Sequence, residues 1–344
     1  MTSLTLFRCM KKICLALLLF TSLIACTSKK KIPDVSNIKI DVQVQRFDKD
    51  FFAIDTSNVE ASLNNLQKKY PAFLNDYLYN ILMVPPFPDS VVMKVKLFLR
   101  DYKPLYDSVE QKFTSLKEAD EIKRGMQFIK YYFPKYHFSQ NVITFIGPLE
   151  GYGNVLTSQG LAVGLQLYLG KNFSVYQTDF ISNVYPAYRS RRFEPNYIAT
   201  NCMHNLLDDM FAYNPAGKPL IEQMIESGKR LYLLDYLLPE TPDSVKTGYT
   251  QQQLEGCYDH EADIWNFFLK NDLLYQNDPF LIREYINDGP KTTALGEASP
   301  GNIGQFVGWQ IVKKWMEKNP SKTMEQLMQT PAKQIFDEAK YKPR

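Results

Sequence analysis

The stretch QNVITFIG (residues 140–147), followed after a glycine-rich loop by GLAVGLQLYLG (residues 160–170), decides the fold class. Both segments are apolar, either rich in β-branched residues or alternating, and turn residues bound them, so they predict two strands. The loop that separates them, GPLEGYGNVLTS (residues 147–158), lacks the Gly-Lys-Ser/Thr ending of a phosphate-binding loop. We therefore interpret that loop as a turn between strands.

The chain on either side of these strands has helical periodicity. IKIDVQVQRFDKDFF (residues 38–52) opens with the alternation of a half-buried strand, but from residue 57 to residue 136 apolar residues recur every three or four positions. From Pro195 to the carboxyl terminus the pattern is helical again. The sequence therefore predicts an α+β fold, namely a single, predominantly helical domain with a small central β-sheet.

The amino terminus resembles a bacterial lipoprotein signal. Arg8, Lys11 and Lys12 precede a short apolar run that ends in LIAC (residues 23–26), which is similar to the lipobox. This pattern predicts a signal peptide over residues 1–25, a lipidated tether over residues 26–37 and a globular domain over residues 38–344. The alternative is an ordinary signal peptide with a cysteine at this position by chance.

Acylation of Cys26 would anchor the protein to a lipid bilayer, because two or more acyl chains hold a protein on a membrane durably. Thr27, rather than aspartate, follows the cysteine, which in the bacterial sorting rule favours the outer membrane. The basic residues Lys29 to Lys31 differ from the acidic tethers of surface-exported proteins. We expect a lipid anchor in the outer membrane, with the domain facing the periplasm.

The net charge and the cysteine content limit which classes of partner and which covalent links the sequence predicts. The chain has 40 Lys and Arg against 37 Asp and Glu, and removal of the signal takes three of the basic residues, which leaves a neutral mature chain. Nucleic acid is therefore not an expected partner. Cys202 and Cys257 could form a disulfide in an oxidising periplasm or remain two buried thiols, and the sequence leaves both open.

YIATNCMHNLLDDMF (residues 197–211) resembles the metal-binding helix of zinc peptidases. Such a helix needs two histidines four residues apart and a glutamate beside the first. In one register Thr200 and Asn201 replace the first histidine and the glutamate, with His204 as the second histidine; in the other, Asn205 and Asp208 replace the glutamate and the second histidine. Because an asparagine amide cannot accept a proton from water at neutral pH, we predict no catalytic residue and no bound metal.

Other side chains could complete a site or hold an anion. Glu226 and His260 are alternative metal ligands that could join His204, although scattered structural roles explain them as well. Arg189, Arg191 and Arg192 lie in YRSRRF beside aromatic residues. They could form an anion-binding groove or belong to a solvated face.

Several motifs together resemble the gliding-motility lipoprotein family GldB. They are VQRFDKDFF (residues 44–52), GLAVGLQLYLG (residues 160–170), NDGPKTTALG (residues 287–296), SPGNIGQFVGWQIVKKWMEKNP (residues 299–320) and KYKP (residues 340–343). The resemblance implies an envelope lipoprotein linked to surface motility, with no assigned reaction. The family is also similar to predicted zinc-dependent proteases, which implies a zincin-like architecture with a degenerate metal helix. On that comparison Thr200 and His204 fall at the two histidine positions and Asn201 at the glutamate.

We therefore expect a membrane-anchored, non-enzymatic envelope protein without a cofactor. Its pseudo-peptidase scaffold would bind a protein or peptide segment in a former substrate groove, and its partners would be envelope proteins of a motility or secretion machinery. The alternatives are a metal-dependent hydrolase with an altered zinc site and a structural lipoprotein with no groove function. Gly301, Gly304 and Gly308 share one face at three- and four-residue spacing, which predicts close backbone packing there.

Overall fold

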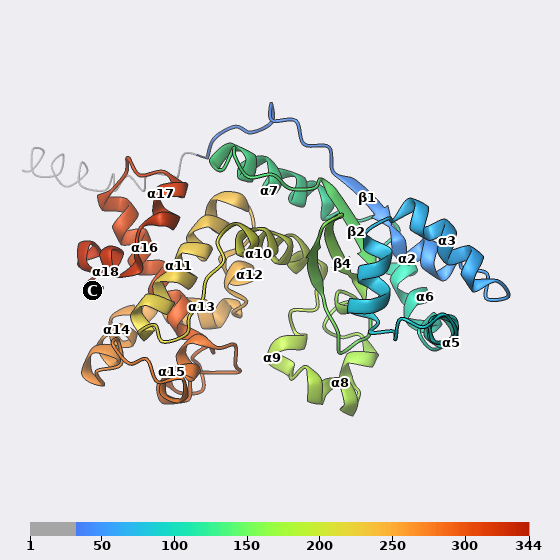
Figure 1. The fold of residues 1–344 in the computed structure, drawn as a ribbon. Helices are drawn as coiled ribbons and strands as arrows, with labels where there is room; N and C mark the ends of the chain where they lie inside the picture. The colour runs from blue at the N-terminus through green and yellow to red at the C-terminus, as the bar shows by residue number, and fades with distance from the viewer. Residues whose placement is uncertain (1–31, 344) are drawn as a thin grey trace, which may run out of the picture. The chain divides into compact units, whose positions relative to one another are not determined.

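A computed structural model describes residues 32–343 of the chain (Figure 1). From Val35 onward the described residues form one compact unit, which holds every strand and helix that the structure describes. Cys26 and the predicted signal peptide lie outside the described residues. No helix within residues 32–343 is long and apolar enough to cross a membrane.

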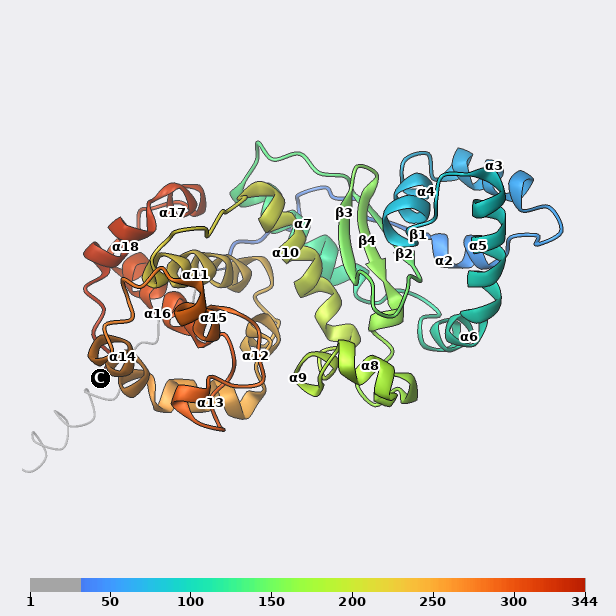
Figure 2. The same cartoon turned by 60° about the horizontal axis from the view of Figure 1, so that its bottom comes forward.

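A mixed four-stranded sheet lies at the centre of this unit (Figure 2). Its spatial order is β1-β2-β4-β3, in which β1 pairs parallel with β2, β2 pairs parallel with β4, and β3 pairs antiparallel with β4. The strands are β1 (Gln43–Arg46), β2 (Asn141–Phe145), β3 (Asn154–Thr157) and β4 (Gly160–Gly164). With the helices around it, this sheet confirms the predicted α+β class and the two strands predicted from residues 140–170.

Two details of the sheet differ from the prediction. The loop interpreted as a turn contains β3, because Asn154–Thr157 folds back on β4 through a tight turn closed by hydrogen bonds between Thr157 and Gly160. The strand expected within residues 38–52 is only four residues long. Helix α2 follows it at once, since Phe47 and Phe51 lie one helical turn apart and are both fully buried.

The two faces of the sheet contact different hydrophobic clusters. Ile143, Phe145 and Ala162 contribute to the smaller cluster, together with fully buried aromatic side chains such as Phe47 and Phe73. Figures 1 and 2 show the helices of the amino-terminal third on this side of the sheet. They are α2 (Phe47–Phe52), α3 (Val59–Lys69), α4 (Phe73–Asn75), the π-helical turn Asp76–Ile81, α5 (Pro88–Asp101) and α6 (Lys103–Lys112).

The opposite face contributes Val142, Leu161 and Val163 to the larger cluster. Helices α7 (Ala119–Tyr132) and α10 (Ile198–Met210) lie on this side, and α10 contacts both β3 and β4. The other helices are α8 (Asp179–Val184), α9 (Ala187–Ser190), α11 (Leu220–Leu237), α12 (Asp243–Thr247), α13 (Gln251–Asp259), α14 (Glu261–Lys270), α15 (Pro279–Ile286), α16 (Ile303–Lys318), α17 (Met324–Gln329) and α18 (Ala332–Ala339).

Helices α11 and α16 cross at a pair of glycines. A Cβ atom on Gly308 would lie 1.7 Å from the carbonyl oxygen of Met224, and one on Gly228 would lie 2.2 Å from the carbonyl carbon of Gly308. Gly304 is similarly close to the carbonyl oxygen of Tyr285, at 2.7 Å. The predicted close packing is therefore present at all three glycines. Gly301 precedes the helix, and a Cβ atom there would lie 2.3 Å from the carbonyl oxygen of Gly289.

Candidate functional site, a polar cavity beside helix α10

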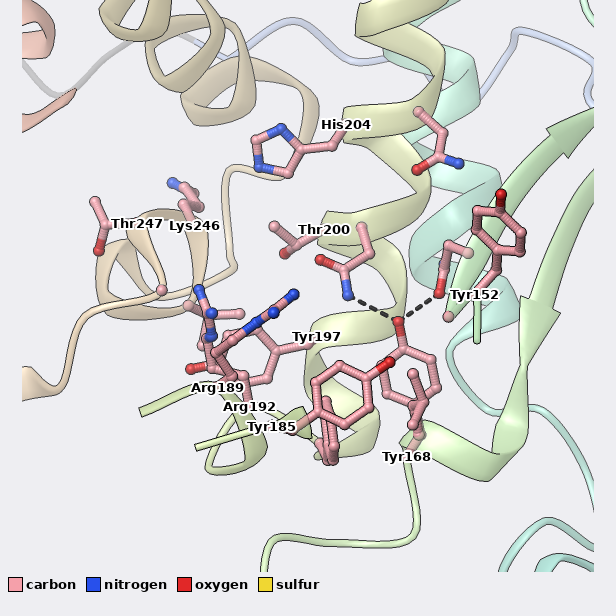
Figure 3. Close-up of a pocket in the computed structure, with 18 of the residues that line it drawn as sticks. Tyr152, Tyr168, Tyr185, Arg189, Arg192, Tyr197, Thr200, His204, Lys246 and Thr247 are labelled. Atoms are coloured by element: carbon pink, nitrogen blue, oxygen red, sulfur yellow. Dashed lines mark hydrogen bonds between the residues drawn. The ribbon is translucent and has the colours of Figure 1, made fainter. Parts of the chain in front are cut away.

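A cavity of about 510 Å³ lies beside α10. Five segments form its wall: the glycine-rich loop that leads into β3, the turn after β4 that carries Leu167 and Tyr168, the arginine-bearing segment around α9, one face of α10, and the end of α12 (Figure 3). Its lining residues are Gly151, Tyr152, Gly153, Asn154, Leu167, Tyr168, Tyr185, Arg189, Arg192, Phe193, Tyr197, Thr200, Asn201, His204, Asn205, Val245, Lys246, Thr247 and Gly248. Among the described residues, none that lines this cavity carries a carboxylate.

Helix α10 turns one face to the core and another to the cavity. Ala199, Met203 and Leu206 are fully buried. Thr200 and His204, one helical turn apart, project from the cavity side (Figure 3). Asp208, one turn further, is exposed and forms an ion pair with Arg230, 3.1 Å away, outside the cavity.

The hydroxyl group of Thr200 has no hydrogen-bond partner among the described residues. Only 2% of the residue is exposed, and its Oγ1 atom is buried. A buried polar atom without a partner lowers the stability of the folded state, typically by about 1–3 kcal/mol. Such an atom in a cavity wall is available to hydrogen-bond a bound molecule.

The imidazole of His204 is also free to interact. It forms no hydrogen bond or ion pair within residues 32–343. Burial lowers the pKa of His204; the nearby carboxylate of Asp208 opposes this shift and the guanidinium of Arg230 adds to it. The ring is therefore neutral at pH 7 and can either donate or accept a hydrogen bond.

Asn201, at the position that the zinc-protease comparison gives to the catalytic glutamate, is held in a chain of hydrogen bonds. Its side-chain amide donates to the hydroxyl of Tyr168 at 2.7 Å, and that hydroxyl donates to Asn154 (Figure 3). The amide of Asn154 in turn donates to the sulfur of Cys202 at 3.2 Å. The amide of Asn201 thus links α10 to Tyr168 after β4 and, through that hydroxyl, to the first residue of β3.

Both cysteines of the described domain are free thiols. Cys202 and Cys257 are buried and form no disulfide. Burial raises the pKa of each thiol to about 12, so neither is a thiolate at neutral pH. Of the two possibilities that the sequence left open, the structure has the two buried thiols.

Three cations line the cavity, and carboxylates outside its lining compensate them to different degrees. The ammonium of Lys246 is almost fully buried and paired with Asp235 at 3.2 Å and Asp243 at 3.1 Å. Arg192 contacts the carboxylate of Asp288, whereas Arg189 is 4.0 Å from the same oxygen. The two arginines therefore share one carboxylate between them.

Of the predicted site residues, Thr200, Asn201, His204, Arg189 and Arg192 come together in this cavity. Arg191 does not: its guanidinium donates to the carbonyl oxygen of Gly248 at 2.7 Å, and it lines a neighbouring cavity of about 140 Å³.

The alternative metal ligands are also elsewhere. Glu226 forms an ion pair of 2.6 Å with the buried ammonium of Lys229, and His260 is exposed, with its Nδ1 atom 3.5 Å from the carboxylate of Asp263. Within residues 32–343, no group of three or more His, Cys, Asp or Glu side chains is placed to hold a metal ion. The structure therefore does not assemble His204, Glu226 and His260 into one site.

Sequence reasoning missed the tyrosines and the α12 side of the cavity. Tyr152 lies in the glycine-rich loop, and Tyr185 precedes the arginine segment, so aromatic residues beside those two motifs were an available signal. Lys246 and Thr247 carry no motif; they reach the cavity because α12 packs against α11.

Comparison with curated proteins and with solved structures gave no match. The zincin-like part of the fold prediction therefore remains a prediction. The model of one protein family, described as gliding motility protein GldB and labelled as a lipoprotein type, matches residues 28–343. That label fits a membrane-anchored protein. Because the match covers nearly the whole chain, the protein belongs to the GldB family of gliding motility proteins.

Proposed function

We propose that this protein is a membrane-anchored envelope lipoprotein whose cavity beside α10 binds a protein or peptide segment without catalysing a reaction. The acylated residue is Cys26, the membrane is the outer membrane, and the domain faces the periplasm. Membership of a gliding-motility family suggests that the bound segment belongs to a motility or secretion component of the envelope.

The lining of the cavity carries this proposal. Its volume, about 510 Å³, lies within the roughly 300–1,000 Å³ of typical ligand sites. Hydroxyl, amide and guanidinium groups line it together with the rings of Tyr152, Tyr185 and Tyr197. This mixture of donors and aromatic surface suits a peptide, which presents carbonyl acceptors and apolar side chains.

The same lining argues for binding rather than hydrolysis. A hydrolase of the zinc type needs three protein ligands and a general base for the water. The wall of the cavity offers His204 as its one strong zinc ligand, and the amide of Asn201 is hydrogen-bonded to Tyr168. The rival reading, a metal-dependent hydrolase, would require ligands that this wall does not supply.

Metal analysis separates the two readings. After dialysis against a mild chelator, we expect the full chain to retain well under one zinc ion per molecule and to cleave no peptide. His204→Ala should leave both results unchanged. Near-stoichiometric zinc that is lost in His204→Ala would instead favour the metal-dependent hydrolase.

The anchor is tested by substitution. Cys26→Ser removes the only thiol placed at a lipobox, so the protein should move from the membrane fraction to the soluble fraction. The control is Cys202→Ser, which alters a buried thiol of the globular domain. Continued sedimentation of Cys26→Ser with membranes after salt and carbonate washes would show that lipid at this residue is not the anchor.

Peptide binding can be followed at His204, because the chain has only three histidines. His137 is exposed and His260 lines a different cavity, so their imidazole signals are internal controls. We expect a pool of random, end-blocked hexapeptides to shift the His204 resonances of the full chain in neutral detergent, with the other two unchanged. A His204 signal that does not respond at saturating peptide would reject the binding function.

A further inference from the structure

We infer that the ligand of this cavity is an acidic peptide segment whose carboxylate binds Arg189 and Arg192 in place of Asp288. This inference rests on the proposed binding function and names the chemistry of the ligand.

The two arginines present their guanidinium groups on one side of the cavity. Arg189 lies in the last turn of α9, and Arg192 follows it by three residues. Figure 3 shows both facing the side of α10 from which Thr200 and His204 project. The side chain of Arg189 is 47% exposed and lies over the ring of Tyr185, with its guanidinium carbon 5.2 Å from the ring centroid. Guanidinium groups placed in this way suit a planar carboxylate.

Asp288 shows that the pair accepts a carboxylate. Its Oδ2 atom contacts Arg192 and lies 4.0 Å from Nε of Arg189. The carboxylate is 45% exposed, so this ion pair is solvated and contributes little to stability. A carboxylate from a ligand can therefore exchange with Asp288, and Asp288 acts as an internal competitor.

The remaining groups of the wall favour a negative ligand. Lys246 faces two carboxylates, Asp235 and Asp243, so it offers no free positive charge to a ligand. The two arginines share the single charge of Asp288, so a local surplus of one positive charge lies at their end of the cavity. The buried hydroxyl of Thr200 has no partner within the described residues and is available to donate to an oxygen. The described lining also lacks any carboxylate that would repel an anion.

The aromatic walls favour a peptide over a bare anion. Tyr152 is 53% exposed, and the rings of Tyr185, Phe193 and Tyr197 also line the cavity. These rings offer apolar surface for the residues that flank an acidic side chain. Phosphate shares the arginine-binding chemistry but would leave this surface uncovered, so phosphate binding is a separate arm of the test.

The experiment compares two matched pools of end-blocked hexapeptides with uncharged residues at all positions but one. The third residue is Glu in one pool and Gln in the other. The full chain in neutral detergent is titrated with each pool and with inorganic phosphate, and the His204 resonances report occupancy. We expect the Glu pool to bind about tenfold more tightly than the Gln pool, as charge-assisted hydrogen bonds predict.

Substitutions assign the effect to named residues. Arg189→Gln combined with Arg192→Gln should weaken binding of the Glu pool about tenfold and change the Gln pool little, since only charge-assisted contacts are lost. Asp288→Asn should strengthen binding of the Glu pool, because the competitor is gone. Arg100→Gln and Asp263→Asn, which alter exposed charges outside this cavity, are the controls, and unchanged circular dichroism shows that each variant folds.

Each outcome decides between the two proposals. Equal binding of the Glu and Gln pools would overturn the acidic-peptide inference and leave peptide binding standing. Failure of both pools would reject both proposals. Phosphate that binds more tightly than the Glu pool would replace the peptide with a phosphate-bearing ligand, and weaker binding by Asp288→Asn would show that Asp288 shapes the site rather than competing for it.

Discussion

His204 is half-buried, and its imidazole forms no hydrogen bond or ion pair with the described part of the chain. Because burial lowers the pKa of its imidazole, the folded protein binds a proton at this site less readily than the unfolded chain, whose histidine pKa is about 6.5. The unfolded state therefore gains relative stability as the pH falls below about 6.5. His204 thus opposes folding in mildly acidic solution.

We predict that His204→Gln reduces the pH dependence of stability. Between about pH 7.5 and pH 5.5, the free energy of unfolding of the unmodified protein should decrease more than that of the variant, because glutamine takes up no proton in this range. Urea unfolding at several pH values measures the difference. His137→Gln, at an exposed position, is the control, and parallel pH profiles for His204→Gln and the unmodified chain would contradict the prediction.

At the scale of residues, the spacing along α10 predicted which side chains share a face of the helix. The sequence did not predict which side chains of other segments they would contact. The four-residue interval from Thr200 to His204 places both on one side of α10, as predicted. The hydrogen bond from Asn201 to Tyr168 joins residues 33 positions apart, and it depends on how α10 packs on the sheet. Local periodicity contains no information on such a contact.

At the scale of elements, the crossing of α11 and α16 depends on two glycines. Gly308 leaves no space for a side chain, since its Cβ atom would overlap the carbonyl oxygen of Met224. Relief would require the two helices to separate, and both contribute fully buried side chains to the larger hydrophobic cluster.

We predict opposite effects for alanine at two helical glycines. Gly308→Ala should destabilise the fold by roughly 1–3 kcal/mol or more through overpacking. Gly256→Ala, in α13, meets nothing within 4 Å and should stabilise it by about 0.5–1 kcal/mol through higher helix propensity. Thermal unfolding measures the midpoint of both variants and of the unmodified protein. A midpoint for Gly308→Ala equal to that of the unmodified protein would refute close packing at the crossing.

Sequence patterns located the elements that carry an apolar or glycine pattern of their own better than those that depend on a partner. The glycine spacing in α16 correctly indicated close packing, and the apolar runs correctly indicated β2 and β4. Strand β3 was missed because its four residues acquire their structure from pairing with β4 rather than from their own periodicity.

At the scale of the whole domain, the sheet separates two hydrophobic clusters. Neighbouring residues of β2 belong to different clusters, Val142 to the larger and Ile143 to the smaller. Loss of either cluster would expose one face of the same sheet, so the two should unfold together.

We predict that Phe73→Ala, in the smaller cluster, destabilises the larger one as well. The expected loss is about 3–5 kcal/mol for a fully buried phenylalanine. All three tryptophans, Trp265, Trp309 and Trp315, belong to the larger cluster, so their fluorescence reports on the side remote from the substitution. The tryptophan transition should shift together with the far-ultraviolet circular dichroism, whereas an unshifted tryptophan transition would mean that the clusters unfold independently.

The parallel pairing of β1 with β2 also constrains the order of folding. Gln43 pairs with Asn141, 98 residues later in the chain, so a chain made from its amino end contains β1 long before its partner exists. Closing so large a loop is slow, and an unpaired strand edge can meanwhile pair with another chain. Strand β1 has only four residues, three of which are Gln43, Gln45 and Arg46. A strand so short and polar is a poor template for pairing with another chain while β2 has yet to be made.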